Sequence, residues 1–591
     1  MSYSSKNVKS VLGSINIPER FPFPYAPEKF TSKEKKILTQ FFTNYDKPIY
    51  AIYNLPQEVV GAMFSRYSRT SKSVRRLFMD EFIKGKSARD FTAPLALSSA
   101  EERTKNFYKR VFAEFGDDSV IQMGSVHIAF EYVSQLAVKV IEDQRIGAAY
   151  IEKSTRYVDF GNKVNNHYLF TEPSEIMNSS YAMEYLAWNK LAFSSYIKAL
   201  PFARKYFRKK FPLREQVFTN PKTGGEIIYK NIKSAKEKEI AKKAYDRASR
   251  ARSFDSVRLF LPITIVSNLG AHCSGQSVEN MINKMLSSSL AEIRLAGKMA
   301  YEELVKISPN FLQHIDHKYG EVQREYKSNL RESQLRVVDE LSSKLKSVKK
   351  KNVRLVDCDP NALVKLASQI IYIYSRKGLS KKDVLARVKK LKEKELIDIL
   401  MKAIDRKGVR LNRRHKLPRA FEHVFAEIEF YQDYGVYKDL QRNRMSTTER
   451  GFYLAEKTQI PDEYKDKGME KVLESYNKLA KMTKVLQKKL MSSEDSKLQN
   501  AAEYIMLHGS MVRFSIKANL RQWVFFSELR TIEGGHPSYR NAMQKAAKEI
   551  IKVYPFMKPL FAYVNWTKDV GLGRLRAEIK TQEKLSKLKG N

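Results

Sequence analysis

The sequence predicts a helix-dominated fold with a few short strands, divided into two related halves. Apolar residues recur at every third or fourth position through long stretches such as 58–83 and 277–307, which is the spacing of amphipathic helices. A run rich in β-branched and aromatic residues at 424–437 is typical of a strand. The segment 361–378 resembles 57–73, which indicates that the second half repeats the pattern of the first.

These features divide the 591 residues into four parts. Residues 1–45 are rich in Ser, Pro and Lys, and we expect them to form an N-terminal arm. Residues 46–341 form the first predicted domain, which contains a basic insertion at about 203–253. The lysine-rich segment 342–352 has few core residues and is expected to be a linker, and residues 353–591 form the second domain.

The chain is strongly basic, with 107 Lys and Arg residues against 65 Asp and Glu and a formal net charge of +42. Its 43% of hydrophobic residues provide ample material for packed cores, which excludes a disordered or fibrous protein. The excess charge attracts polyanions such as RNA. Several basic runs, however, place Lys or Arg beside Glu at helical spacing, which is also typical of solvated helices. Composition therefore leaves RNA or another polyanion open as a partner.

Cysteine usage and hydropathy favour a soluble, cytoplasmic protein without membrane contact. Cys273 and Cys358 are too few for a disulfide framework and belong to no CxxC pair, and Cys273 is best explained as a small buried hydrophobe. No stretch approaches the roughly 20 apolar residues that span a bilayer. His314 and His317 lie close in sequence but lack a third ligand set, so no metal site is predicted.

Three stretches combine charged residues at specific spacings, namely DQRIGAAYIEKSTRYVDF at 143–160, RAFEHVFAEIEFYQDYGVYKDLQRNRM at 419–445 and NLRQWVFFSELRTIEGGHPSYR at 519–540. The first resembles RHRxxSxNExSxRY, the signature loop of the flavin-dependent thymidylate synthases (ThyX). The second resembles the strand, helix and RHR of that family, and the third its C-terminal helix. RYSR at 66–69 and GDDS at 116–119 are similar to elements of its long tandem members.

The resemblance implies an α+β fold with two tandem ThyX-like domains, each with helices packed on a small antiparallel sheet. The two halves retain complementary parts of the motifs. The first half keeps the nucleotide loop and an arginine before a Leu-Pro: Glu152, Ser154, Thr155, Arg156, Tyr157 and Arg258. The second half keeps the flavin-side residues Glu422, Arg442, Arg444, Asn519, Arg521, Arg530 and His536. Because the family shares each active site between subunits, we expect one complete composite site for each pair of domains.

The resemblance also implies an activity, which is reductive methylation of dUMP to dTMP. FAD is the implied cofactor, with methylenetetrahydrofolate as carbon donor and NADPH as reductant. The expected substrate contacts are Glu152, Ser154, Thr155, Arg156, Arg258, Arg442 and Arg530, and the expected FAD contacts are Glu422, Arg442, Arg444, Asn519, Arg521 and His536. Arginine suits a phosphate because its planar fork forms charge-assisted, bidentate hydrogen bonds.

Arg442 and Arg530 are the expected catalytic residues. For Arg530 the role is to stabilise negative charge that develops on the uracil oxygens. No cysteine lies in these motifs, which fits the family's use of hydride delivery from reduced flavin. Since the family forms homotetramers, two tandem chains are expected to pair as a homodimer.

Several positions depart from the family's pattern, four of which bear on the activity. Asn443 replaces the central His of RHR, Asp439 replaces a usual Gln, and Ala149 and Ile151 replace the Ser and Asn of the loop. An Asp at position 439 repels a phosphate unless a cation such as Arg442 neutralises it. These changes are compatible with an altered substrate and retained flavin binding.

Each candidate also has a structural alternative. Arg442 and Arg444 fit a solvated helix face, and Glu152 and Arg156 are spaced as a helical ion pair. His536 fits a capped turn. Two alternative functions remain open beside the enzyme: a ThyX-derived RNA- or ribosome-binding protein, and flavin-dependent methylation of uracil in RNA.

Overall fold

The computed structural model describes residues 27–55, 57–67, 70, 72–83, 118–219, 225–316, 318–342, 351–404 and 410–588. Most of the predicted N-terminal arm, residues 343–350 of the predicted linker and residues 116–117 of GDDS lie outside these ranges. The described chain forms two compact units. Unit 1 comprises residues 1–126, 273–279 and 302–317, and unit 2 comprises residues 127–272, 280–301 and 318–591.

Unit 1 is a small helical body. Its helices are α2 (Ser32–Leu38), α3 (Gln57–Tyr67), α4 (Val74–Leu77), α7 (Asp118–Met123) and α14 (Gln313–Asp316). Helix α2 begins at a capping box in which Thr31 and Glu34 satisfy each other's backbone N–H groups. The rings of Phe41 and Phe42 meet Phe78 edge to face, with centroids 5.3 and 5.4 Å apart, and form part of its core.

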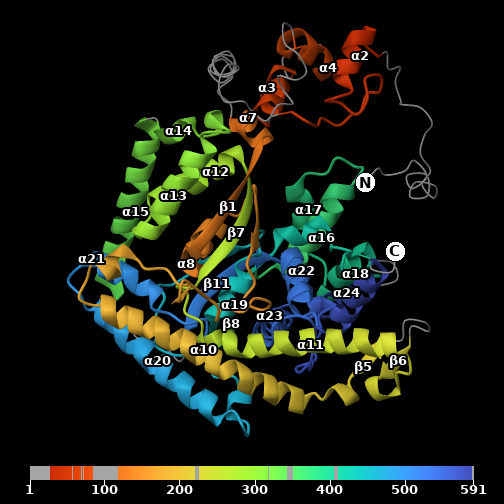
Figure 1. Ribbon diagram of the computed structural model, residues 1–591. Helices are drawn as coiled ribbons and strands as arrows, with labels where there is room; N and C mark the ends of the chain where they lie inside the picture. Colours follow the sequence, from red (N-terminus) through yellow and green to blue (C-terminus); the bar gives the residue numbers. More distant parts are fainter. Residues whose placement is uncertain are drawn as a thin grey trace. The chain divides into compact units, whose positions relative to one another are not determined.

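Unit 2 contains the second main sheet and most of the first (Figure 1). The strands of the first sheet, in spatial order, are β1 (Ser125–Ser134), β7 (Val266–Ser274) and β2 (Ala148–Glu152). Those of the second, all antiparallel, are β10 (Thr447–Arg450), β11 (Met511–Asn519), β9 (Phe425–Asp433) and β8 (Val353–Cys358). Two short hairpins add β3 (Lys163–Val164) with β4 (His167–Tyr168), and β5 (Val217–Thr219) with β6 (Glu226–Ile228).

The two sheets repeat one chain path, as the sequence predicts. In each, the last strand of the repeat lies between the first two, so β7 separates β1 from β2 as β11 separates β9 from β10. Helices follow at equivalent places: α8 (Gln135–Glu142) and α19 (Tyr434–Leu440) after the first strands, α12 (Gly275–Leu286) and α22 (Leu520–Arg530) after the central ones. The side chains of Ser134 and Asp433 cap α8 and α19 in the same way, each accepting a 3.0 Å hydrogen bond from the backbone.

Two of the predicted elements end earlier than the hydrophobic pattern suggests. The strand expected over 424–437 stops at Asp433, because its side chain caps α19 and turns the chain into a helix. The helix expected over 277–307 is divided into α12 and α13 (Ala291–Leu304) by a turn at 287–290. In the first case a strand changes directly into a helix, and in the second a short turn separates two helices.

A layer of long helices covers one side of the sheets in unit 2 (Figure 1). It consists of α10 (Ala182–Lys210), α11 (Ala235–Val257) and α20 (Glu470–Met491), with α24 (Leu575–Leu588) packed on α11. Trp188 of α10 is fully buried and donates to Thr483 of α20 over 2.9 Å. The predicted basic insertion corresponds to the end of α10, the hairpin β5–β6 and most of α11.

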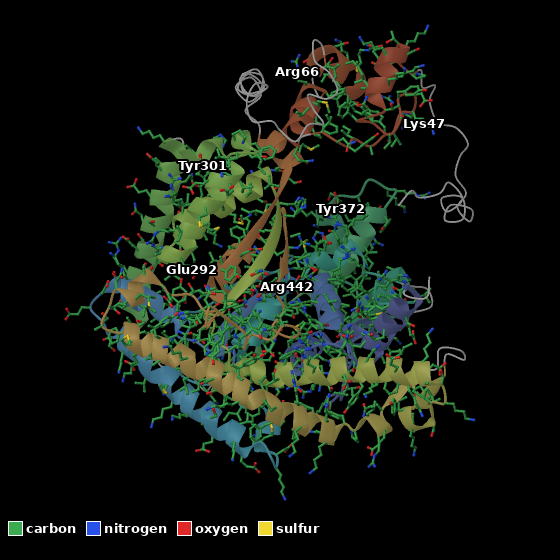
Figure 2. The ribbon with its side chains drawn as sticks, in the orientation of Figure 1. Lys47, Arg66, Glu292, Tyr301, Tyr372 and Arg442 are labelled. Atoms are coloured by element: carbon green, nitrogen blue, oxygen red, sulfur yellow. The ribbon has the colours of Figure 1, made fainter. Side chains whose placement is uncertain are left out.

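The remaining helices of unit 2 are α9 (Ser174–Met177), α15 (Lys318–Ser342), α16 (Ala362–Tyr374), α17 (Lys381–Val388), α18 (Glu393–Ile404), α21 (Ser496–Ala501) and α23 (Pro537–Val553). Glu292 of α13, labelled in Figure 2, accepts hydrogen bonds from the backbone and hydroxyl of Ser134 and from the hydroxyl of Tyr504. Burial raises the pKa of this carboxyl. Within the described ranges, no helix is long and apolar enough to cross a membrane.

Candidate functional site

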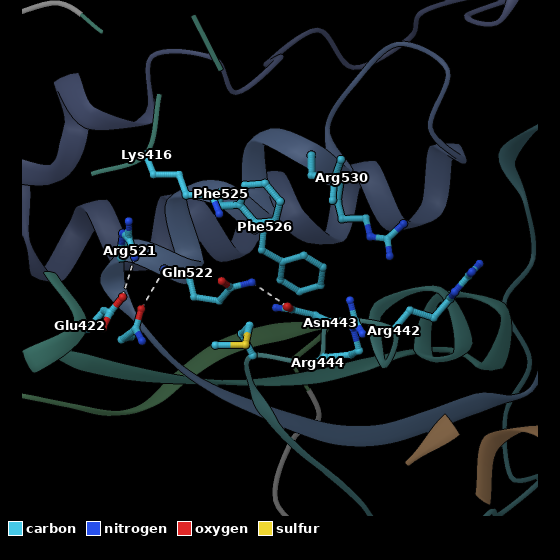
Figure 3. A pocket seen from close by; sticks show the side chains of 13 residues that line it. Lys416, Glu422, Arg442, Asn443, Arg444, Arg521, Gln522, Phe525, Phe526 and Arg530 are labelled. Atoms are coloured by element: carbon cyan, nitrogen blue, oxygen red, sulfur yellow. Dashed lines mark hydrogen bonds and ion pairs between the residues drawn. The ribbon is translucent and has the colours of Figure 1, made fainter. Parts of the chain in front are cut away.

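A cavity of 410 Å³ in unit 2 gathers most of the flavin-side residues (Figure 3). It is lined by Lys416, Glu422, Arg442, Asn443, Arg444, Met445, Asn519, Arg521, Gln522, Phe525, Phe526, Leu529 and Arg530. One wall is helix α22, and the facing residues come from the loop between α19 and β10. The sequence placed six of these residues in a site: Glu422, Arg442, Arg444, Asn519, Arg521 and Arg530.

The wall of α22 is held in place by hydrogen bonds at its start. Asn519 caps the helix, because its side-chain oxygen accepts from the backbone N–H of Gln522 over 2.9 Å. The amide of Gln522 in turn donates to Asn443 over 2.6 Å. Arg521 donates to Glu422 over 2.6 Å and to the carbonyl of Leu417 over 2.7 Å. These contacts tie the helix to the loop on the far side of the cavity.

The charge of the cavity is far from balanced. Among the described residues that line it, five are cationic and Glu422 is the only carboxylate. Burial acts to raise the pKa of Glu422, but hydrogen bonds from Arg521 and Arg419 lower it overall, so this group is ionised. Arg442 has no ion-pair partner among the described residues. The guanidinium of Arg530 lies over the rings of Phe526 and Tyr539, at 5.8 and 5.7 Å.

Glu152 of the nucleotide loop lies outside this cavity, in a buried cluster of charges. Its carboxylate accepts from Lys438 over 2.8 Å and from Lys139 over 3.3 Å, and Lys139 also pairs with Glu142. Burial acts to raise the pKa of Glu152, but the two lysines lower it well below its usual value. Glu152 does not pair with Arg156, so the two residues are not a helical ion pair.

Arg156 is buried and bound to Asp255 through a bidentate ion pair of 2.5 and 2.6 Å. Burial acts to raise the pKa of Asp255, but Arg156 lowers it well below its usual value. Ser154 accepts from the backbone N–H of Arg156, and Thr155 is buried. The phenol oxygen of Tyr539 lies 3.5 Å from Arg156. Because Tyr539 also contacts Arg530, a single aromatic ring separates this loop from the cavity.

Arg258 is fully buried and pairs with Asp439 over 3.1 Å. Burial acts to raise the pKa of Asp439, but the charges of Arg258 and Lys438 lower it to about 2. The cation that neutralises Asp439 is thus Arg258 rather than Arg442. Gly435 allows this approach, since a Cβ atom there would lie 2.6 Å from a terminal nitrogen of Arg258.

His536 also lies outside the cavity lining, and it serves as the cap of α23. Its Nδ1 atom accepts from the backbone N–H of Ser538 over 3.2 Å, and Nε2 lies 3.1 Å from the carbonyl oxygen of Asp255. These partners fit a neutral ring that carries its proton on Nε2. Burial lowers the pKa of His536, in agreement with a neutral ring. The capped turn considered in the sequence is therefore present.

The loops of the two halves hold each other by reciprocal contacts. Arg145 donates to the carbonyl of Ser446, and Arg444 donates to the carbonyl of Ala148. In addition, the hydroxyl of Tyr434 at the start of α19 donates to the carbonyl of Gln135 at the start of α8, over 3.1 Å. The loop after α8 and the loop after α19 therefore form one connected region beside the cavity.

Comparison with known proteins identifies the family. The family model described as "Thymidylate synthase complementing protein" matches residues 62–310 and 354–556 of this chain. The chain belongs to this family. The two matched segments correspond to the two halves with equivalent sheets, which confirms the predicted α+β fold of tandem ThyX-like domains.

Relatives of similar length exist in distant organisms. A UPF0159 protein of Chlamydia muridarum is 32% identical over 555 residues, covering 93% of this chain and 98% of its own length. A UPF0159 protein of Thermoplasma acidophilum is 27% identical over 540 residues, covering 89% and 98%. A solved UMP/dUMP methylase of Streptomyces cacaoi, bound with 5-Br dUMP, is 13% identical with a TM-score of 0.27, over 36% of this chain and 95% of its own. At that score it carries no argument here.

Some residues that line the cavity were not predicted from the sequence. Gln522, Phe525, Phe526 and Leu529 follow Asn519 at the spacing of one helix face. Extending the helical period from Asn519 to Arg530 would have found them. Lys416 belongs to a run of basic residues and carries no local signal. The acidic partner Asp255 also lies in no motif, so the pairing of Arg156 was not foreseeable.

Proposed function

We propose that this protein is a flavin-dependent methyltransferase of the thymidylate synthase type, whose cofactor FAD binds in the 410 Å³ cavity. The observation that carries the proposal is the concentration of five cationic side chains around a single carboxylate. Such an excess favours an anionic ligand, because a cleft lined with one sign of charge concentrates ions of the opposite sign. The cavity volume lies within the range of about 300–1,000 Å³ typical of cofactor sites.

The residues present fit a phosphorylated aromatic cofactor. Arg442, Arg444 and Arg521 offer planar guanidinium groups suited to phosphate oxygens. Phe525 and Phe526 add apolar aromatic surface for a ring system. Buried nitrogen atoms of the lining residues Asn443 and Arg530 have no hydrogen-bond partner within the described chain. A ligand with acceptor atoms would satisfy both.

We further propose dUMP as the substrate, with Arg442 and Arg530 holding its anionic groups. FAD, when bound, supplies the hydride chemistry of the reduction, with methylenetetrahydrofolate and NADPH as co-substrates. Arg530 stabilises negative charge on the uracil, because its guanidinium is fixed over two aromatic rings. Arg156 and Arg258 position the loop instead of gripping the phosphate, since buried carboxylates already compensate their charges.

The first test is FAD binding to the purified chain, measured by visible absorption and by quenching of flavin fluorescence. We expect flavin bands, and an FAD affinity that falls at least tenfold in Arg442→Gln. Arg214→Gln is a matched control, because Arg214 is exposed, pairs with the adjacent Glu215 and does not line the cavity. A colourless protein that takes up no FAD would refute the proposal.

The second test distinguishes the substrates. The reduced holoprotein is mixed anaerobically with methylenetetrahydrofolate and either dUMP or a uracil-containing RNA, and 5-methyl products are measured by mass spectrometry. We expect the methyl group on dUMP. Methylation of RNA alone would retain the flavin proposal and replace the substrate, whereas methylation of neither would leave only a flavin-binding protein.

A further inference from the structure

A second cationic cavity forms a groove between α10 and α11. These two helices lie side by side in the helical layer of unit 2 (Figure 1). Its volume is 360 Å³, and it is lined by Arg204, Arg208, Asp246, Ser249, Arg250 and Ser253. None of these residues lines the FAD cavity. The helices run antiparallel here, because Arg208 pairs with Asp246 while Arg252 lies over the ring of Phe207.

Helical spacing builds this groove. Arg204 and Arg208 are four residues apart and share one face of α10. Asp246, Ser249, Arg250 and Ser253 are spaced at positions i, i+3, i+4 and i+7 and share one face of α11. Ser249 and Ser253 are buried and donate their hydroxyl protons back to carbonyls of α11, so their oxygens face the groove as acceptors only. The donors of the groove are therefore its guanidinium groups.

The positive charges of the groove are only partly compensated by the described residues of the protein. Arg204 and Arg250 have no ion-pair partner in the described part of the chain, and the Nε atom of Arg204 is buried without a hydrogen-bond partner. Arg208 does have a partner, since it lies 2.9 Å from Asp246. The two side chains of that pair are 57% and 45% exposed, so the pair contributes little and is easily exchanged.

We propose that the α10–α11 groove binds a phosphate group, held by Arg204, Arg208 and Arg250. Three guanidinium groups against one carboxylate leave a net charge that matches a phosphate monoester dianion or neighbouring diester anions. The surrounding surface favours an extended ligand, because α10 ends with Arg208, Lys209 and Lys210 in its last turn. The phosphate belongs either to a nucleic-acid backbone or to a free phosphorylated molecule.

The test measures three probes on the full chain: a single-stranded oligo(U) by fluorescence anisotropy, and UMP and inorganic phosphate by calorimetry. We expect Arg204→Gln/Arg250→Gln to weaken binding at least tenfold. Asp246→Asn should strengthen binding severalfold, because it removes the competing carboxylate and frees Arg208. Lys190→Gln is the control, since it removes one exposed charge from the start of the same helix, away from the cavity, and it should change affinity less than threefold.

The outcomes separate the two sources of phosphate. Binding of oligo(U) alone, weakening steeply with salt, identifies a nucleic-acid backbone. Comparable binding of UMP or phosphate identifies a free phosphorylated molecule. If no probe binds, or if the double variant and Asp246→Asn both bind like the unmodified chain, the proposal is wrong. The gain expected for Asp246→Asn keeps the test decisive even if the double variant folds poorly.

Discussion

The 410 Å³ cavity and the neighbouring loop of the first half contain the same kinds of charged residue, but the two regions differ in how those charges are compensated. In the cavity, Arg442 has no partner among the described residues and five cations face one carboxylate. In the loop region, Glu152, Arg156 and Arg258 are buried, and each is paired with an opposite charge from elsewhere in the chain. Both regions match the family's motifs, so the sequence alone does not distinguish them.

Whether a charge is paired distinguishes residues that are available to a ligand from residues that hold the structure in position. An unpaired cation beside solvent costs little and is available to a ligand. A buried charge is tolerated only with a partner, and separating the two leaves an uncompensated charge in a medium of low polarity. We therefore assign ligand contacts to the cavity, and we assign the attachment of the two halves to the paired loop. Lys438 of the second half and Glu152 of the first illustrate this attachment.

The largest effect is expected when the paired region loses one charge. Lys438→Met leaves Glu152 with Lys139 alone, which Glu142 also shares. Removing one partner of a buried pair costs about 3–5 kcal/mol. We therefore expect a loss of this size in the free energy of unfolding, measured by urea denaturation.

A matched surface pair provides the control for this change. Lys489 lies 2.9 Å from Glu184, and the two side chains are 47% and 37% exposed, so Lys489→Met should cost less than about 1 kcal/mol. The double variant Lys438→Met/Glu152→Gln should recover part of the stability lost in Lys438→Met. Equal losses of stability at Lys438 and Lys489 would contradict the conclusion that the buried ion pairs hold the two halves together.

The second largest effect is expected at Gly435, because its lack of a side chain leaves room for the guanidinium of Arg258. In Gly435→Ala the new Cβ atom would lie 2.6 Å from Arg258 and 2.9 Å from a carboxylate oxygen of Asp433. Overpacking of this kind costs about 1–3 kcal/mol. Gly451→Ala is the control, because nothing lies within 4 Å of its Cβ position. Thermal unfolding of the two variants should differ clearly, and equal melting temperatures would show that Arg258 is not tightly enclosed.

A third effect concerns pH and His508, a buried residue beside the paired region. Its Nδ1 atom lies 2.9 Å from the carbonyl oxygen of Leu261. Burial, together with the charges of Lys438 and Arg258, lowers the pKa of His508 to about 3. The unfolded chain binds a proton near pH 6.5, so between these values the unfolded state holds more protons and stability falls as the pH is lowered.

For His508 alone this linkage amounts to about 2 kcal/mol between pH 7 and pH 5. His508→Asn replaces the Nδ1 donor with an amide that does not titrate, so its stability should depend less on pH by that amount. The measurement is urea denaturation of both proteins at the two pH values. Parallel pH profiles would show that His508 is not buried in its neutral form.

The sequence predicted much of the cavity but little of the paired region, for a physical reason. The cavity residues Arg521 and Arg530 belong to α22 and Asn519 caps its start, so their grouping follows from local structure and from the family's motif. The pairing of Arg156 with Asp255 joins residues far apart in sequence, and Asp255 lies in a helix of otherwise basic character. Such a contact depends on tertiary packing, which no local pattern records.

The same limit explains the roles of Asp439 and His536. At the sequence level Asp439 was expected to need Arg442, because Arg442 lies three residues away. In the structure Arg258 reaches it from the other half of the chain. The proline after His536 indicated that this residue caps a helix. The sequence did not indicate that His536 lies outside the cavity lining. Motif spacing thus identified residues that line one cavity, but it did not predict the partners of Asp439 and His536.

The smallest effect on stability is expected for Arg442→Gln. This variant tests whether a cation of the cavity is free of a structural role. Arg442 is exposed. Its positive charge repels that of Lys139 and acts to lower the pKa of Lys139. Removing the charge of Arg442 therefore relieves repulsion and breaks no ion pair among the described residues. Surface changes of this kind alter the free energy of unfolding by less than about 0.5 kcal/mol. Urea denaturation without FAD should therefore find Arg442→Gln as stable as the unmodified chain. A loss larger than about 1 kcal/mol would make Arg442 a structural residue, because that exceeds what a solvated charge contributes.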